Sequence, residues 1–258
     1  MKHLSLPDGK IVRYRVEGDK AGSRNGWAVL NRSPILNGAF GSWRTGEQHT
    51  WKADSKETMT PGERAELHRK MQAAQQARAA EEARVRADAA ARAVKLWSGA
   101  KPATNDHPYL RAKGVYAFGL RSLRDQLMIP ARDVDGKLHT LQFIGPDGTK
   151  RFMTGGRIAG CYYAIGRPDD ALLLAEGYAT AATLHQVTGR AVAVCFNCGN
   201  LAAVAKALRG KFPRLRLLIC ADNDATTPGN PGLAAARAAA QAVGGRVAVP
   251  VFAGVSHE

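Results

Sequence analysis

Three acidic side chains stand at the ends of two apolar runs in the last third of the sequence. Glu176 follows the run 172–175, and Asp222 and Asp224 follow the run 217–221. Short apolar runs of this kind are typical of buried parallel strands, whose carboxyl ends meet at the edge of an α/β sheet where ligands bind. The spacing therefore makes Glu176, Asp222 and Asp224 candidate ligands for a divalent metal ion.

The local charge pattern favours a site over a solubilising surface. Residues 171–258 contain eight Lys and Arg but only four Asp and Glu, and three of those four are Glu176, Asp222 and Asp224. Taken alone, Asp222 and Asp224 could form an Asx-type turn at a strand end. Their pairing with Glu176 makes a functional site the better interpretation.

The sequences Glu176-Gly177 and Asp222-Asn223-Asp224 resemble two motifs of the Toprim domain, which occurs in bacterial-type primases, topoisomerases and related nucleases. In that domain Glu-Gly follows the first strand and Asp-x-Asp follows the third. The segments before them narrow the resemblance to primases of plasmids, conjugative elements and phages, over roughly residues 105–252. They are 107–114, 127–130, 135–137, 141–144, 147–152 and 155–156. The resemblance implies a phosphoryl-transfer centre that depends on Mg²⁺ (or Mn²⁺), with Glu176, Asp222 and Asp224 as the metal-binding and catalytic carboxylates.

The resemblance further implies a DNA primase, a nucleotidyltransferase that makes short RNA primers on single-stranded DNA from NTPs. Asp222 and Asp224 would bind the metal, and Glu176 would bind it or transfer a proton. A replicative helicase, separate or fused, is an expected partner. Two alternatives remain: a Toprim nuclease using the same metal edge, and a non-catalytic single-stranded-DNA-binding module of a mobile-element replication protein.

Basic residues of the resembling segments are expected to contact nucleic acid or nucleotide. Lys150 matches the basic motif that touches phosphate in such primases, so we count it with the catalytic residues. The alternative for each cation is an ordinary solvated surface charge. The further candidates for nucleic-acid or nucleotide contact are Arg151, Arg157, Arg111, Lys113 and Asn200.

The sequence departs from the pattern of these primases in two places. Thr180 stands four residues after Glu176, where bacterial primases usually have an acid. The sequence stops at Glu258 before a further acidic stretch, which suggests a fragment of a longer protein.

Charge and hydropathy restrict the partners. The 258 residues carry a net charge of +15, which favours a polyanionic partner, although a basic surface without such a partner is the alternative. No apolar run approaches the roughly 18–20 residues of a membrane span, and the polar first residues lack a signal-peptide core. We therefore expect a cytoplasmic protein that does not bind membranes.

The elements that position the acids follow from the alternation of apolar runs and helix-forming segments. We predict an α/β domain over 168–258, with four parallel strands joined by right-handed crossovers and helices on both faces of the sheet. Asn200 would cap the second helix. The predicted strands are 171–175, 191–196, 215–221 and 246–251, and the helices are near 178–188, 200–210 and 232–243.

Upstream, residues 101–167 are predicted to be a strand-rich primase-core subdomain. Turn signals at 133–136 and 145–148 indicate a β meander, and residues 101–108 are expected to be a linker. Residues 59–100 predict a long helix, with Thr60 as N-cap and no Gly or Pro between residues 63 and 98. Its few large apolar residues indicate an exposed spacer that packs only near its C-terminal end.

Residues 1–58 predict a small β-rich module that must work without zinc, because no Cys occurs before Cys161. Cys195 and Cys198 have metal-ligand spacing but no second Cys or His pair, so we expect reduced thiols rather than a zinc site. The module's basic and aromatic residues could bind single strands by charge and base stacking, whereas a small core is an equally good account of Trp27 and Phe40. The residues are Lys10, Arg13, Arg15, Lys20, Arg24, Arg32 and Arg44, with Trp27, Phe40, Trp43 and Trp51.

Overall fold

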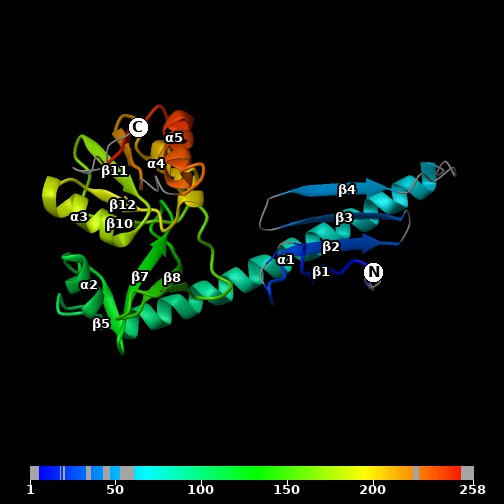
Figure 1. The fold of residues 1–258 in the computed structure, drawn as a ribbon, viewed down its shortest axis with the longest axis horizontal. Helices are drawn as coiled ribbons and strands as arrows, with labels where there is room; N and C mark the ends of the chain where they lie inside the picture. The colour runs from blue at the N-terminus through cyan, green and yellow to red at the C-terminus, as the bar shows by residue number, and fades with distance from the viewer. Residues whose placement is uncertain are drawn as a thin grey trace. The chain divides into compact units, whose positions relative to one another are not determined.

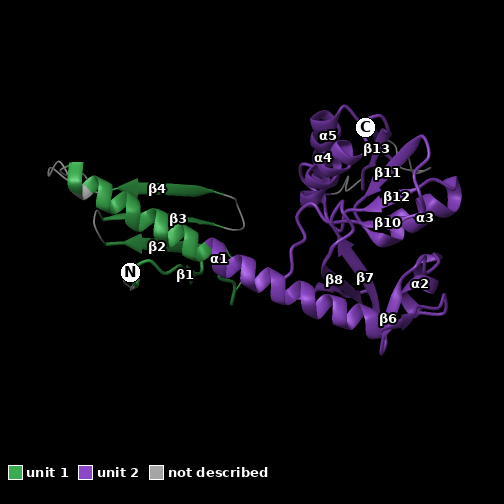
Figure 2. Cartoon of the chain, turned by 180° about the vertical axis from the view of Figure 1, so that it is seen from behind, with its two compact units in different colours: residues 1–78 green, residues 79–258 purple. Residues whose placement is uncertain are grey.

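The structure is a computed structural model. It describes residues 6–17, 19, 21–32, 36–42, 47–52, 61–222 and 227–250, apart from the side chain of residue 63. The chain divides into two compact units, residues 1–78 and 79–258 (Figure 2). The boundary between the units falls inside helix α1 (Pro61–Gly99). Asp224, Trp43 and Thr60, which the sequence singled out, lie outside the described residues.

The first unit contains an antiparallel meander (Figure 1). Its strands are ordered β1-β2-β3-β4 in space as in sequence. The aromatic side chains do not all enter a core, since Trp27 is half-buried whereas Phe40 is 43% and Trp51 42% exposed. The strands are β1 (Val12–Tyr14), β2 (Gly26–Asn31), β3 (Asn37–Ser42) and β4 (Gln48–Lys52).

Helix α1 begins with a proline in its first turn, where the missing amide hydrogen costs nothing. Its described side chains are mostly exposed as far as Asp88, and burial begins at Ala89 and Ala93. From there the helix packs on the sheet of the second unit through Ala93, Leu96 and Trp97. The long helix and the confinement of its packing to the C-terminal part agree with the sequence prediction.

The second unit starts with another antiparallel meander, ordered β5-β6-β7-β8-β9. Both predicted turns are present, because the amides of Gly136 and Gly148 donate 3.0 Å hydrogen bonds to the carbonyls of Asp133 and Gly145. These two glycines have φ of 84° and 85°, which only glycine adopts at little cost. The elements are β5 (Lys101–Pro102), α2 (Pro108–Lys113), β6 (Arg121–Leu123), β7 (Gln126–Arg132), β8 (Leu138–Ile144) and β9 (Lys150–Phe152).

The predicted linker over 101–108 is wrong. Lys101 and Pro102 pair with β6, and Pro108 begins α2. The helix starts here because the ring of His107 accepts a hydrogen bond from the amide of Tyr109, and it ends at Gly114 in the left-handed conformation. A helix of six residues is too short to give a recognisable periodic pattern in the sequence.

The α/β sheet that follows has the order β10-β12-β11-β13-β14. Four strands are parallel, in the segments where the sequence predicted them, and β10 adds an antiparallel edge that was not predicted. With only three residues, β10 is too short to show an alternating pattern. The elements are β10 (Tyr163–Ile165), β11 (Ala171–Ala175), α3 (Tyr178–Thr188), β12 (Val192–Val194), the 3₁₀ turn η1 (Cys198–Asn200), α4 (Leu201–Lys211), β13 (Arg216–Cys220), α5 (Pro231–Val243) and β14 (Arg246–Ala248).

Alternate residues of the parallel strands enter two different cores. Leu172 and Leu174 of β11 pack with α4 and α5 on one face of the sheet. Leu173 and Ala175 pack with α3 on the other face, in a cluster that also contains Leu127 and other residues of the meander. The meander and the α/β sheet therefore share one core.

We expect Gly156→Ala to lower the free energy of unfolding by about 1–3 kcal/mol, the usual cost of overpacking. A Cβ at Gly156 would lie 2.3 Å from the Cβ of Thr140, whose residue is fully buried. Gly210→Ala in α4 is the matched control, because its Cβ would meet nothing within 4 Å and Ala favours a helix by up to about 1 kcal/mol. Urea unfolding of both variants measures the difference, and equal stability would contradict the close approach.

Candidate active site

The carboxylates of Glu176 and Asp222 follow two adjacent parallel strands. In the register of β11 and β13, Leu174 is paired with Ile219. Glu176 and Asp222 stand two and three residues beyond these partners, so both lie at the carboxyl edge of the sheet. Both residues are half-buried.

Burial and the negative charges of Glu176 and Asp222 raise the pKa values of two neighbouring cysteine thiols. Burial raises the pKa of Cys195, at the end of β12, and the charge of Glu176 raises it further. Burial together with Asp222 raises the pKa of Cys220 to about 11. Both cysteines are therefore neutral thiols at pH 7.

The donor chemistry at this edge fits a hard divalent cation, which prefers carboxylate oxygens. Within the described ranges, no group of three or more His, Cys, Asp and Glu side chains is placed to hold a metal ion. The third predicted ligand, Asp224, lies outside those ranges. The structure thus brings two of the three predicted ligands to one sheet edge.

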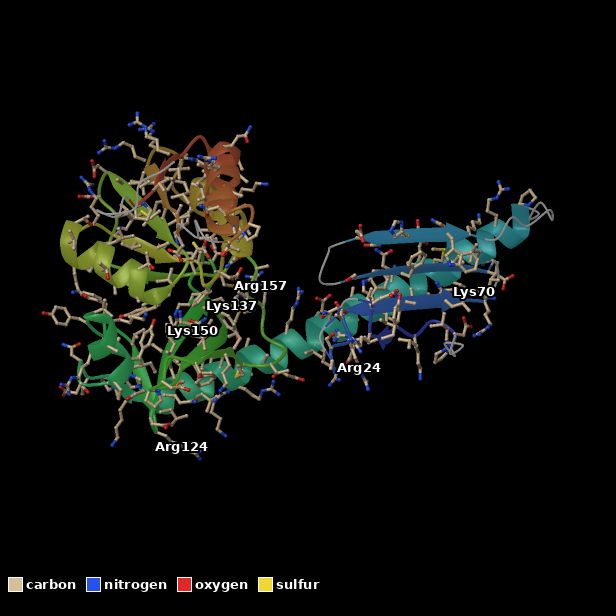
Figure 3. All side chains as sticks on the ribbon, in the orientation of Figure 1. Arg24, Lys70, Arg124, Lys137, Lys150 and Arg157 are labelled. Atoms are coloured by element: carbon tan, nitrogen blue, oxygen red, sulfur yellow. The ribbon has the colours of Figure 1, made fainter. Side chains whose placement is uncertain are left out.

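Lys150 reaches the same edge from the meander. Its Nζ lies 3.8 Å from the position that a Cβ would take at Gly177, the residue after Glu176. On its other side the Nζ is 6.0 Å from the ring centre of Tyr109, which belongs to α2. Figure 3 shows Lys150 between the meander and the α/β sheet. An ammonium group therefore stands beside the backbone that carries the first carboxylate.

Gly177 is also the N-cap of α3. No side chain caps this helix end, and its first turn contains no acid. The first amides of a helix have no intrahelical acceptor and carry the positive end of the helix dipole. The N-terminus of α3 and the ammonium group of Lys150 together form a positively charged site that suits a phosphate group.

The two arginines near Lys150 are engaged with other groups. Arg151 is exposed on β9, donates a 2.6 Å hydrogen bond to Gln126 Oε1 and lies 4.6 Å from the ring centre of Phe143. Arg157 donates a 3.2 Å hydrogen bond to Asp133 Oδ2, and its Nη2 is 2.9 Å from His139 Nε2.

Asp133 is at the centre of the hydrogen-bond network that contains Arg157 and His139. Burial raises its pKa, but hydrogen bonds from His139 and from the amides of Lys137 and Asp135 outweigh burial and lower the pKa below its usual value. Asp133 is thus ionised at neutral pH and neutralises Arg157. The positive charge of Arg157 serves this network, so the structure offers no support for its predicted contact with nucleic acid.

Asn200 is 4% exposed and its amide group is fully engaged with backbone. Its Nδ2 donates to the carbonyls of Cys161 and Cys195 at 2.9 Å each, and its Oδ1 accepts from the amide of Gly160 at 2.8 Å. Asn200 occupies the predicted N-cap position of α4, but its side chain makes no capping hydrogen bond because it is used in these bonds. Asn197 caps η1 by accepting a hydrogen bond from the Asn200 amide. These contacts indicate a structural role.

Arg111 and Lys113 stand exposed in the last turn of α2. Sequence reasoning missed Phe196, whose ring meets Phe152 of β9 at 5.4 Å and 76°. Phe196 follows β12 with φ of 75°, which is rare outside glycine and clusters at functional sites. Nothing in the sequence signals this conformation.

Comparisons with known proteins show a Toprim match and similarity to DNA primases. Residues 171–254 match the Toprim domain family. The chain is 40% identical over 260 residues to a DNA primase TraC of Escherichia coli, covering 96% of this chain and 24% of that protein. A second DNA primase TraC of Escherichia coli is 38% identical over 96% of this chain and 18% of its own length. The Toprim match agrees with the predicted resemblance, and the similarity to DNA primases extends over nearly all of this chain, beyond the residues 105–252 for which it was predicted.

The chain spans about a quarter or less of the length of these relatives. Among solved structures, the primase fragment of the bacteriophage T7 primase-helicase protein is similar with a TM-score of 0.43 and 13% identity, over 60% of this chain and 71% of that chain. None of the described helices is both long enough and apolar enough to cross a membrane.

We expect Asn200→Asp to lower the free energy of unfolding by about 2–4 kcal/mol, because a carboxylate cannot donate to the two buried carbonyls. Asn197→Asp is the matched control, since Asp also accepts the capping hydrogen bond. Urea unfolding gives the stabilities, and single-stranded-DNA affinity is measured on the folded variants. A large loss of affinity without loss of stability would return Asn200 to the binding residues.

Proposed function

We propose that this protein is a DNA primase that joins NTPs into short RNA primers on a single-stranded DNA template. The proposal rests mainly on one observation: Lys150, a cation of the meander, lies beside Gly177 at the carboxylate edge of the α/β sheet. The relatives named DNA primase support it.

In this proposal Asp222 and Asp224 bind Mg²⁺ (or Mn²⁺), and Glu176 binds it too or accepts a proton. The ion supplies charge neutralisation and alignment of the 3′-hydroxyl with the α-phosphate, which this reaction needs more than covalent help. The protein's own part is to hold these carboxylates on adjacent strands, where the sheet fixes their spacing.

Lys150 and the amides at the start of α3 hold a phosphate of the nucleotide or template. The ammonium group lies between the ring of Tyr109 and Gly177. Arg111, Lys113 and Arg151, which are exposed, contribute more diffusely to template binding. A replicative helicase, separate or fused, remains the expected partner.

We expect Asp222→Ala and Glu176→Ala each to abolish primer synthesis and to leave DNA affinity intact or higher, because the loss of negative charge removes a metal ligand but no phosphate contact. Asp169→Ala, which removes an exposed acid that precedes the amino end of β11, at the opposite end of this strand from Glu176, is the control and should keep its activity. Incorporation of labelled NTPs on a single-stranded template measures the result. Undiminished synthesis by either variant would remove that residue from catalysis.

The same assay tests the reaction type. If the wild-type protein cuts a labelled template and makes no primer, the Toprim nuclease replaces the primase. If it binds the template without either reaction, the protein is a binding module.

We expect Lys150→Ala to lower the rate of primer synthesis by about 100-fold, the effect of removing one preorganised donor at a reacting centre, with little change in DNA affinity. Lys113→Ala is the matched control: a surface lysine weakens binding and reduces the salt slope by about 0.7 per contact with single strands. Primer yield and DNA affinity are compared for both variants. Parallel, small losses in both would place Lys150 on the general basic surface.

A further inference from the structure

Three ring-bearing side chains share one face of the N-terminal sheet. Phe40 is paired with His49, and Gly38 with Trp51, across β3 and β4. Paired residues of an antiparallel sheet, and residues two apart in a strand, point to the same side. We call Phe40, His49 and Trp51 the aromatic face. Two of these rings, Phe40 and Trp51, are 43% and 42% exposed.

The rings are arranged as flat platforms. The rings of Phe40 and His49 stack with centres 5.2 Å apart and an angle of 26°. A Cβ at Gly38 would lie 2.9 Å from Trp51 Nε1, so the indole rests directly on the backbone of β3. The glycine thus lets one side of the indole pack on the sheet, while 42% of the residue remains exposed.

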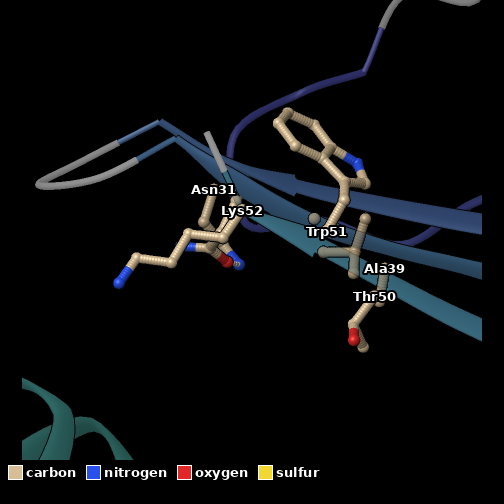
Figure 4. Close-up of a pocket in the computed structure, with 8 residues that line it drawn as sticks. Asn31, Ala39, Thr50, Trp51 and Lys52 are labelled. Atoms are coloured by element: carbon tan, nitrogen blue, oxygen red, sulfur yellow. Dashed lines mark hydrogen bonds between the residues drawn. The ribbon is translucent and has the colours of Figure 1, made fainter. Parts of the chain in front are cut away.

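The neighbouring residues add polar groups along an open edge. Strand β4 is at the edge of its sheet, and all five of its residues are exposed. A groove of about 420 Å³ at this edge is lined by residues that include Asn31, Asn37, Thr50 and Lys52. Figure 4 shows the Trp51 indole and the Thr50 side chain on opposite sides of the strand. By the same alternation Lys52 lies on the Thr50 side, so this polar groove is on the face opposite the aromatic face.

The charge of this segment selects the kind of partner. Residues 1–52 contain nine Lys and Arg and four Asp and Glu. Two of the acids serve the fold, because Asp8 accepts a hydrogen bond from the amide of Arg32 and Asp19 accepts one from the amide of Val16. Exposed rings with an excess of cations suit single-stranded nucleic acid, whose bases stack while its phosphates are neutralised.

We propose that the aromatic face binds single-stranded DNA, with bases stacked on Phe40 and Trp51. This surface lies in the first unit, whereas the carboxylate edge lies in the second. The proposal rests on the proposed function only in naming DNA as the ligand. It gives the template a binding surface that requires no metal ion and takes no part in nucleotidyl transfer.

The test measures affinity of the full chain for a labelled oligonucleotide by fluorescence anisotropy, without divalent metal. We expect Trp51→Ala and Phe40→Ala each to weaken binding by about tenfold, within the range for loss of one stacked base. Trp51→Leu keeps an apolar side chain over Gly38 and should weaken binding as much, which separates stacking from sheet stability. Tyr116→Ala, which removes a 55% exposed ring in the second unit, is the matched control and should bind like wild type.

The salt dependence separates the two kinds of contact. The slope of log affinity against log salt should stay unchanged in Trp51→Leu, because a stacked ring releases no counterions, whereas loss of a phosphate contact would lower the slope by about 0.7. Wild-type affinity in Trp51→Leu and Phe40→Ala would overturn the proposal even if primers are made. If binding weakens as expected but wild type makes no primer, the proposed function fails and this surface stands.

A second measurement needs no substitution. Irradiation of the wild-type complex with an iodouracil oligonucleotide joins the base to a ring stacked on it. We expect the joined peptides to contain Phe40 or Trp51. Joined peptides exclusively from the second unit would overturn the proposal.

Discussion

The site depends on one packing constraint, the apolar core that the meander shares with the α/β sheet. Leu127 and Ile129 of β7 lie in the same buried cluster as Tyr178 of α3 and Val194 of β12. Close-packed interiors resist displacement because any shift opens voids. The strand that carries Lys150 therefore cannot move away from α3 without disturbing a core made of residues that take no part in chemistry.

Hydrogen bonds also connect the segment between α2 and β6 with the elements of the α/β sheet. The hydroxyl of Tyr178 donates a 2.8 Å hydrogen bond to the carbonyl of Tyr116, and that of Tyr163 donates to the carbonyl of Phe118. Burial raises the pKa of Tyr163 to about 12 and raises that of Tyr178 as well. Both hydroxyls keep their protons, and so their role as donors, far above neutral pH.

The predictable parts of this structure are those in which a repeated pattern reflects one environment. The apolar runs before Glu176 and Asp222 predicted buried parallel strands, because both faces of these strands are covered. The glycines at 136 and 148 predicted the meander, because each turn needs a positive φ. The carboxylate edge followed from these two patterns and from the resemblance.

The unpredicted features depend on single long-range contacts. Asn200 looked like a helix cap, since a cap and a buried tie between loops use the same amide chemistry, and only the fold brings Cys161 to it. Phe196 has no local signal for its left-handed backbone, which the contact with Phe152 accompanies. Strand β10 is defined by its partner β12 rather than by its own three residues. Each of these required knowledge of which distant segments meet.

In this strongly basic chain, Glu176 and Asp222 place two negative charges at one edge of the sheet. A net charge of +15 attracts a polyanion over the whole surface, whereas carboxylates grouped at a phosphate-binding edge repel the same polyanion locally. That repulsion falls only where positive charge is supplied beside the acids. Lys150 supplies it from β9, and the acid-free first turn of α3 adds the positive end of a helix dipole. Thr180 fits this arrangement, because an acid at that position would oppose the dipole's attraction for phosphate. The carboxylate of Glu176 thus adjoins both the N-terminus of α3 at Gly177 and the ammonium group of Lys150, which is the combination that the proposed function requires.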